Sequence, residues 1–311
     1  MKVAILEPYS LAAQAQLKAH PRVELVTDAS AAEAVLIRSR TQIDRAFLDA
    51  APRLQCVITA TSGFDHVDWR ECAKRGVIAA HTPAANAQST AELTVGLMLA
   101  WERRIPAAYK NVRGGKWRDA LARPHGLDGK TLGIVGLGRV GARVARVTHA
   151  LGMKLFAYDP YIEADRFAEY DCERIGFTEL LRSVDMVTLH VPLTKETKHL
   201  MNQPTLNEMQ NEAVLINTCR GPVVDESDLM VALDDGVIAG AAMDVIEREP
   251  PPPGHRILTH PKLILTPHIG AFTERAWEKA SAEAVHKLCQ FAEGRSVADT
   301  LPLATPWFPH T

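Results

Sequence analysis

Several features that mark membrane, secreted or nucleic-acid-binding proteins are absent from this sequence of 311 residues. Its longest apolar run, Leu93 to Trp101, is about half as long as a bilayer-spanning helix requires. Lys and Arg number 35 against 37 Asp and Glu, so the charge balance favours neither nucleic acid nor an anionic membrane as a partner. The opening letters MKVAILEP enter a strand pattern at once, which predicts that no secretory leader is present.

Cysteine is also scarce, and its spacing excludes two further classes. There are five cysteines, an odd number without any CxxC pair, so we expect neither a disulfide framework nor a zinc site. The positions are Cys56, Cys72, Cys172, Cys219 and Cys289. We therefore expect reduced thiols, a cytoplasmic location and no bound metal.

What is present is the alternation of strands and helices. Short apolar runs such as VAILEP, AVLIRS and LQCVITA predict buried parallel strands, each followed by a polar or helical stretch. AQSTAELTVGLMLAWERRI, from Ala87, predicts a long helix, and from Pro106 the helical pattern loosens. Further strands are expected at DMVTLHVP, AVLINTC, IAGAAMDV and KLILTP, with helices at 225–233 and 274–293. The fold class is α/β, with doubly wound parallel sheets.

The segment GKTLGIVGLGRVG places a GxGxxG loop between a strand at 131–135 and a helix. In that setting Gly136 permits a tight turn, Gly138 lets a pyrophosphate approach the backbone, and Gly141 lets the helix pack closely on the strand. In the helix, Val140, Val144, Val147 and Leu151 recur at helical spacing and are predicted to pack on the sheet. A glycine-rich turn without a ligand is the plainer alternative.

Asp159, at the end of the next strand LFAYDP, lies about twenty residues beyond the glycine loop. A carboxylate there accepts both hydroxyls of an adenosine ribose and repels a 2′-phosphate. No Arg or Lys immediately follows it, so we predict NAD rather than NADP as the cofactor. The alternative is that Asp159 only begins an Asp-Pro turn.

Three charged side chains follow predicted strands in the second half of the chain. Arg220 follows AVLINTC, Glu249 comes shortly after IAGAAMDV, and His268 follows KLILTP. Ligands bind at the carboxyl ends of strands in open α/β sheets. An arginine binds a carboxylate there, and an acidic side chain orients an imidazole that transfers a proton. Each residue taken alone could instead be an ordinary turn or surface residue.

From about Gly129 to Ala271 the chain resembles the D-isomer-specific 2-hydroxyacid dehydrogenases, which include phosphoglycerate, glycerate and D-lactate dehydrogenases. The matching phrases, in the family's order, are GKTLGIVGLGRVG, DMVTLHVPLTKET, LINTCRGPVVDE, GAAMDVIEREP and TPHIGA. SGFDHVD and STAELTVGLMLA resemble family segments more loosely. The resemblance implies a flavodoxin-like substrate domain at 1–86 plus 271–311, and a Rossmann NAD domain at 87–270. It also implies a homodimer and a substrate cleft between the domains.

The resemblance also implies the roles of individual residues. Arg220, Glu249 and His268 would be catalytic, with Arg220 and His268 also touching substrate. The positions expected to bind NAD are Gly136, Gly138, Arg139, Val140, Gly141, Asp159, His190, Val191, Pro192, Thr197, Thr218, Cys219, Asp244 and Gly270. Further substrate-binding positions would be Ser62 and Gly63, which meet the carboxylate, and Arg38 and Ser39 of LIRSRTQID, where Arg38 meets a distal anion or is simply exposed.

Departures from the family pattern leave the substrate open. Cys219 stands where a small residue is usual, and His66 replaces a common Asn. Glyoxylate, hydroxypyruvate, a phosphorylated hydroxy acid and a bulkier 2-oxo acid all remain possible. The alternative function is an NAD(H)-sensing co-repressor of the same fold. That class carries flexible extensions, whereas here only the aromatic tail PWFPHT is unusual, and it is expected to pack on a neighbouring subunit.

Overall fold

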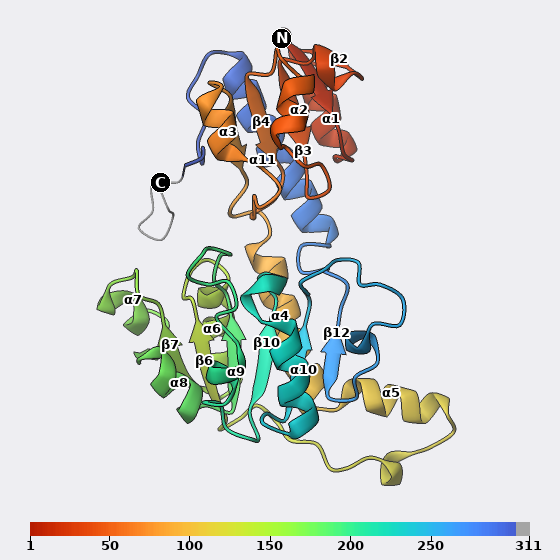
Figure 1. Cartoon of the computed structure of the whole chain (residues 1–311), viewed down its shortest axis with the longest axis vertical. Coiled ribbons are helices and arrows are strands. Elements are labelled where there is room, and N and C mark those ends of the chain that lie inside the picture. The colour runs from red at the N-terminus through yellow and green to blue at the C-terminus, as the bar shows by residue number, and fades with distance from the viewer. Residues whose placement is uncertain (303–311) are drawn as a thin grey trace. The chain divides into compact units, whose positions relative to one another are not determined.

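The computed structural model describes residues 1–302, and the chain separates into two compact units (Figure 1). The terminal unit consists of Met1–Ala87 and the described residues from Ala271 onward. The central unit is Gln88–Gly270. The tail PWFPHT lies outside the described residues. Within 1–302, no helix has both the length and the apolar character needed to cross a bilayer.

The terminal unit is built on a parallel sheet with the strand order β2-β1-β3-β4-β5. Its described strands are β1 (Lys2–Ile5), β2 (Glu24–Val26), β3 (Ala34–Ile37), β4 (Cys56–Thr59) and β5 (Ile78–His81). Every residue of β3 and β4 is buried, as expected of strands covered on both faces. Helices α1 (Leu11–Lys18) and α11 (Glu274–Ala292) pack on one face, and α2 (Arg45–Ala50) and α3 (Trp69–Lys74) pack on the other.

The central unit holds a longer parallel sheet, ordered β12-β11-β10-β9-β6-β7-β8. Its described strands are β6 (Thr131–Val135), β7 (Lys154–Tyr158), β8 (Cys172–Arg174), β9 (Met186–Leu189), β10 (Val214–Asn217), β11 (Gly240–Met243) and β12 (Leu263–Leu265). The chain moves outward from β6 to β8 and then returns to β9 on the other side of β6. The strand order therefore reverses between β6 and β9, the position where such sheets bind ligands.

Helices cover both faces of the central sheet. One face packs on α4 (Ala87–Glu102), α6 (Gly141–Ala150) and α7 (Ala164–Ala168), and the other on α8 (Phe177–Ser183), α9 (Gln203–Leu206) and α10 (Glu226–Asp235). Single 3₁₀ turns lie at η1 (Ala29–Ala31), η2 (Arg118–Ala120), η3 (Gly221–Val223) and η4 (Arg256–Leu258). The predicted fold class, α/β with two doubly wound parallel sheets, is confirmed.

The predicted inner face of helix α6 is partly wrong. Val144 is fully buried and Val140 packs on the core, but Val147 and Leu151 are 43% and 38% exposed. The buried positions are Gly141, Ala142, Val144, Ala145 and Thr148. Gly141 explains the difference, because a Cβ there would overlap the carbonyl oxygen of Gly136. The helix approaches the loop at its glycine and so turns its small residues toward the sheet.

The loosened pattern after Pro106 also conceals a helix, α5 (Ile105–Arg113). Pro106 lies in its first turn, where a proline ring is tolerated because the missing N–H would have no helical partner. None of the α5 residues is buried, and Figure 1 shows the helix projecting from the central unit. Its exposed apolar residues Ile105, Tyr109 and Val112 nevertheless recur at helical spacing, so the helical pattern continues to Arg113.

Candidate active site

The charged residues predicted to act together follow neighbouring strands of the central sheet. Arg220 comes just after β10, and His268 comes just after β12. Strand β11 lies between β10 and β12 in the sheet. Asp244, the residue directly after β11, begins the loop that carries Glu249. These strands are parallel, so their carboxyl ends lie at one edge of the sheet.

His268 and Glu249 form a direct pair. The imidazole Nδ1 lies 2.6 Å from Glu249 Oε2, and the other carboxylate oxygen accepts the backbone N–H of Ile246 at 3.0 Å. The two side chains are 45% and 34% exposed, so a ligand can reach them. His268 adopts a left-handed backbone conformation, with φ 53°. Contact with Glu249 through Nδ1 leaves Nε2 as the nitrogen that can exchange a proton with a substrate.

The pKa of Glu249 is held below its usual value of 4.5. Burial acts to raise it, but the hydrogen bond and charge of His268, the Ile246 N–H and the charge of Arg220 together outweigh that effect. Glu249 is therefore ionised at neutral pH. The stabilisation that ionised Glu249 gives to the folded state is complete above about pH 4.5. It is lost as the pH falls through the lowered pKa of Glu249.

Asp244 holds the loop that carries His268. It is 1% exposed, and its Oδ1 accepts hydrogen bonds from Thr266 Oγ1 at 2.6 Å and from the Ile269 N–H at 2.9 Å. Its Oδ2 accepts the N–H of Gly270 at 2.7 Å. The sequence predicted a cofactor contact for Asp244 and Gly270, and the hydrogen bonds of Asp244 support this loop. That supporting role could not be seen in the sequence.

We expect Asp244→Ala to destabilise the protein, because two backbone N–H groups lose a charged acceptor. Each buried polar group left without a partner costs roughly 1–3 kcal/mol. Urea unfolding would measure the loss, with Asp244→Asn as the control that keeps one acceptor oxygen and loses less. A free energy of unfolding equal to that of the wild type would contradict this assignment.

The glycine loop contains two glycines that the fold requires and one that it does not. Gly136 has φ 92°, and a Cβ there would lie 2.7 Å from the carbonyl oxygen of His190. A Cβ on Gly141 would overlap Gly136. At Gly138, in contrast, a Cβ would meet nothing within 4 Å among the described residues. The fold leaves open space at Gly138, as the approach of a pyrophosphate requires.

The same loop leads through Arg139 and Val140 directly into α6. Val140 is the N-cap residue and makes no side-chain capping bond. The N–H groups of Ala142 and Arg143 already donate to the carbonyls of Gly138 and Val140, so an anionic phosphate would meet the loop amides that precede them, at the positive end of the helix dipole. The loop fits a dinucleotide on these observations.

Asp159 lies beside a cavity of about 470 Å³ at the ends of β7 and β8. Its carboxylate accepts the N–H groups of Leu137 and Tyr161, both at 3.0 Å, which fixes it next to the glycine loop. Arg174 also lines this cavity, although no sequence motif marks it. No local pattern indicates that β8 pairs with β7, so only the sheet order brings Arg174 near Asp159.

The loop after β9 contributes His190, Val191, Pro192 and Thr197. Burial lowers the pKa of His190 to about 3, so its ring is neutral, and Nε2 lies 3.0 Å from Thr188 Oγ1. Val191 packs on the core, and Thr197 Oγ1 donates to the Pro192 carbonyl at 2.6 Å. Of these residues, His190 and Val191 lie opposite Gly136 at the reversal of strand order.

Asn217, a second residue that no sequence motif marks, closes the turn that presents Arg220. Its Nδ2 donates to the Arg220 carbonyl at 2.9 Å, and its Oδ1 accepts the Cys219 N–H at 3.0 Å. Thr218 points instead toward α4, where its hydroxyl lies 2.8 Å from Thr94 Oγ1. An asparagine at the end of a strand carries no sequence signal that separates this role from an ordinary surface position.

Cys219 is expected to be unreactive. Burial raises the pKa of its thiol to about 11, despite the opposing N–H and charge of Arg220. A thiol that is protonated at neutral pH is a poor nucleophile. Iodoacetamide at pH 7–8 should leave Cys219 unmodified in the native protein, as mass spectrometry of the Cys219 peptide would show. Rapid alkylation of this peptide before unfolding would contradict the prediction.

The predicted substrate residues of the terminal unit lie near the ends of β3 and β4. The Arg38 guanidinium lies 5.1 Å from the centre of the Trp277 ring, and its buried Nη1 has no hydrogen-bond partner among residues 1–302, whereas Ser39 is exposed. Ser62 Oγ donates to the Pro83 carbonyl at 3.2 Å. The Gly63 carbonyl accepts from Thr61 Oγ1 at 2.6 Å.

Comparison with known proteins identifies the family. The family model described as D-isomer specific 2-hydroxyacid dehydrogenase, NAD binding domain, matches residues 95–270, more than half of the chain. The chain belongs to the D-isomer specific 2-hydroxyacid dehydrogenases. It is 42% identical over 281 residues to a glyoxylate reductase of Thermofilum pendens, covering 88% of this chain and 82% of the relative.

Two further comparisons extend this result. The dehydrogenase is 38% identical over 271 residues to D-3-phosphoglycerate dehydrogenase of Bacillus subtilis, covering 87% of this chain but 51% of the relative, so it spans about half the length of that protein. The crystal structure of D-lactate dehydrogenase from Aquifex aeolicus, complexed with NAD and lactic acid, matches with a TM-score of 0.83 and 29% identity. That match covers 94% of this chain and 96% of the other.

The family membership confirms three predictions from the sequence. The protein is an oxidoreductase, it uses NAD, and its class is hydroxyacid dehydrogenase. The co-repressor alternative is not favoured, because these relatives are named as enzymes. Among residues 1–302, no cluster of three or more His, Cys, Asp or Glu side chains is arranged to hold a metal ion.

Proposed function

We propose that this dehydrogenase interconverts a 2-oxo acid and its D-2-hydroxy acid, with His268 as the acid/base, Glu249 as its partner and Arg220 as the carboxylate-binding residue. The observation that carries the proposal is the 2.6 Å contact between His268 Nδ1 and ionised Glu249, two strands away from Arg220 in the sheet order. The pair has the arrangement of a general acid/base with its orienting carboxylate.

In the proposed reaction, His268 transfers the proton, Glu249 stabilises its charged form and Arg220 binds the substrate carboxylate. The bound nicotinamide would supply a hydride to the substrate C2 as NADH, or accept one from it as NAD⁺. In reduction, His268 Nε2 donates a proton to the 2-oxo oxygen, and the neutral imidazole that results remains hydrogen-bonded to Glu249. In oxidation, the neutral imidazole takes the hydroxyl proton, and Glu249 stabilises the imidazolium that forms. Arg220 pairs with the substrate carboxylate and fixes C2 relative to His268.

We also propose separate roles for the two units. The central unit binds NAD through the glycine loop and Asp159. Within it, Thr218, Cys219, Asp244 and Gly270 line the nicotinamide end, and His190 to Pro192 with Thr197 border the adenosine. In the terminal unit, the positions proposed to bind substrate are Ser62, Gly63, Arg38 and Ser39. The unpartnered Nη1 of Arg38 supports an anionic distal group.

The substrate itself is best identified with a panel. NADH oxidation should be followed with glyoxylate, hydroxypyruvate, phosphohydroxypyruvate and a longer 2-oxo acid. Glyoxylate comes first, because the glyoxylate reductase is similar over most of both chains. Turnover with any of these acids supports the proposal. Tight NADH binding without turnover of any acid would reject it and restore the NAD-sensor alternative.

We propose a homodimer because helix α5 exposes apolar side chains. This helix buries none of its residues in its own chain, yet it carries large apolar side chains. Ile105, Tyr109 and Val112 are 51%, 63% and 55% exposed. Exposed apolar side chains gathered on one helix are typical of a subunit contact. Sedimentation equilibrium would decide between monomer and dimer.

A cytoplasmic location is likewise a proposal. All five cysteines are free thiols in the structure, and four of them are buried. Unbridged thiols fit a reducing compartment. Cell fractionation with an antibody against this chain would test the location, and recovery outside the cytoplasm would contradict it.

A further inference from the structure

His199 lies in the turn between β9 and α9 and is unusual in its backbone. Its φ is 51°, in the left-handed region that residues other than glycine rarely occupy. Its N–H donates to the Pro222 carbonyl at 2.8 Å, and its own carbonyl accepts Asn202 Nδ2 at 3.0 Å. The turn is therefore fixed against η3, the segment that directly follows Arg220.

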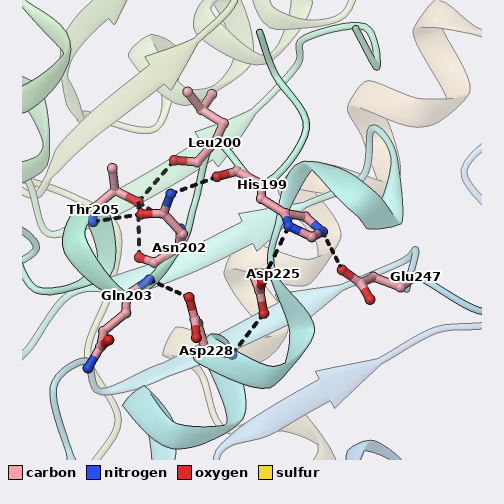
Figure 2. Close-up of polar contacts among 8 residues, drawn as sticks. All are labelled: His199, Leu200, Asn202, Gln203, Thr205, Asp225, Asp228 and Glu247. Carbon is pink, nitrogen blue, oxygen red and sulfur yellow. Dashed lines mark hydrogen bonds and ion pairs between the residues drawn. The ribbon is translucent and has the colours of Figure 1, made fainter. Parts of the chain in front are cut away.

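Both nitrogens of the His199 ring face carboxylates, as Figure 2 shows. Nδ1 lies 3.2 Å from Asp225 Oδ2, and Nε2 lies 2.8 Å from Glu247 Oε1. A neutral imidazole donates from one nitrogen only, whereas an imidazolium donates from both. The two contacts are ion pairs when the ring is protonated, and the protonated ring then joins the two carboxylates.

The two carboxylates belong to the segments that carry the proposed active-site residues. Asp225 ends the segment that begins at Arg220, and it is fixed there because its Oδ1 caps α10 by accepting the Asp228 N–H at 3.1 Å. Glu247 lies two residues before Glu249, and the neighbouring Ile246 N–H is the backbone donor to Glu249. His199 thus links the loop after β10 to the loop after β11.

These two loops already touch at a point where only glycine fits. A Cβ on Gly221 would overlap the Ile246 carbonyl, so the backbones of the two segments lie directly against each other. His199, Asp225 and Glu247 are 36%, 26% and 37% exposed. Ion pairs at this exposure add little to overall stability, so their main effect is on local geometry.

We propose that His199 is a positioning residue, which holds the Arg220 and Glu249 segments in register through its two carboxylate contacts. The inference rests on the proposed function for its kinetic consequence, since Arg220 and Glu249 matter only if they act on the substrate. The geometric part, in which His199 restrains both segments, stands apart from the reaction.

The test compares three variants of the whole 311-residue chain. His199→Ala removes both contacts. His199→Arg places a permanently charged guanidinium, with several N–H donors, between the same carboxylates. The matched control is His260→Ala, because His260 pairs with Asp234 at 3.2 Å in the same unit but joins neither segment. Each variant is measured for kcat and KM, for the Kd of NADH, and for amide hydrogen exchange of peptides covering residues 220–224 and 245–249.

We expect His199→Ala to lower kcat/KM for the 2-oxo acid about tenfold or more, and to leave the Kd of NADH within about twofold. Exchange should become faster in both peptides, His199→Arg should restore most of the lost activity, and His260→Ala should match the wild type. Unchanged exchange in His199→Ala would overturn the proposal. Faster exchange with wild-type kcat/KM in an active enzyme would also overturn it.

The failure of the proposed function would look different. If wild-type protein turns over no 2-oxo acid, or if His268→Ala is fully active, the assigned reaction or its residues are wrong. In that case the exchange measurement alone decides whether His199 restrains the two segments.

Discussion

Replacing His268 with alanine should lower kcat by roughly a hundredfold to ten-thousandfold, which is the range that a positioned acid/base contributes. The loss arises because no other side chain is proposed to give or take the substrate proton. NADH binding should be nearly unchanged, because the glycine loop and Asp159 do not contact His268 in the structure's hydrogen-bond network. Steady-state kinetics together with a fluorescence titration of NADH would measure both.

The control for this experiment is again His260→Ala, which removes a carboxylate-paired imidazole elsewhere in the central unit. It should retain wild-type kcat. If His268→Ala kept kcat within tenfold of the wild type, His268 would not be the acid/base. Loss of activity in both variants would instead indicate a general effect on folding, which thermal denaturation would detect.

Replacing Glu249 with glutamine should shift the pH dependence of both reaction directions to lower pH. The wild-type carboxylate is ionised, since its pKa is held below the usual value, and its charge favours the protonated imidazole at 2.6 Å. The introduced amide would lack that charge but could still accept the Ile246 N–H. Reduction requires protonated His268, so its rate should fall at a lower pH than in the wild type. Oxidation requires the neutral ring, so its rate should rise at a lower pH.

The measurement is kcat/KM against pH in both directions, for the wild type and Glu249→Gln. A useful comparison is Glu247→Gln, whose carboxylate contacts His199 rather than His268 in the wild type. That variant should keep the wild-type midpoint. A profile that does not move in Glu249→Gln would show that the charge of Glu249 does not act on the catalytic proton.

The sequence predicted the parts of the site that depend on neighbouring residues along the chain. The glycine loop follows from Gly136, Gly138 and Gly141 between a strand and a helix, and Asp159 follows from its distance beyond the loop. The positions of Arg220 and His268 follow from the ends of two apolar strands, of which β10 is buried and β12, expected to be buried, is only half-buried because it forms the edge of the sheet. Such features are local, because strand and helix formation is governed by the spacing of side chains within a few residues.

Tertiary structure decided which of these ends meet and what supports them. The pairing of β10, β11 and β12 sets Arg220, Asp244 and His268 along one edge. The same strand order places Arg174 beside Asp159 and joins His199 to two distant carboxylates. Each of these contacts joins residues far apart in the sequence, so no local pattern encodes it. Sheet order, and the close approach that Gly141 and Gly221 allow, determine them instead.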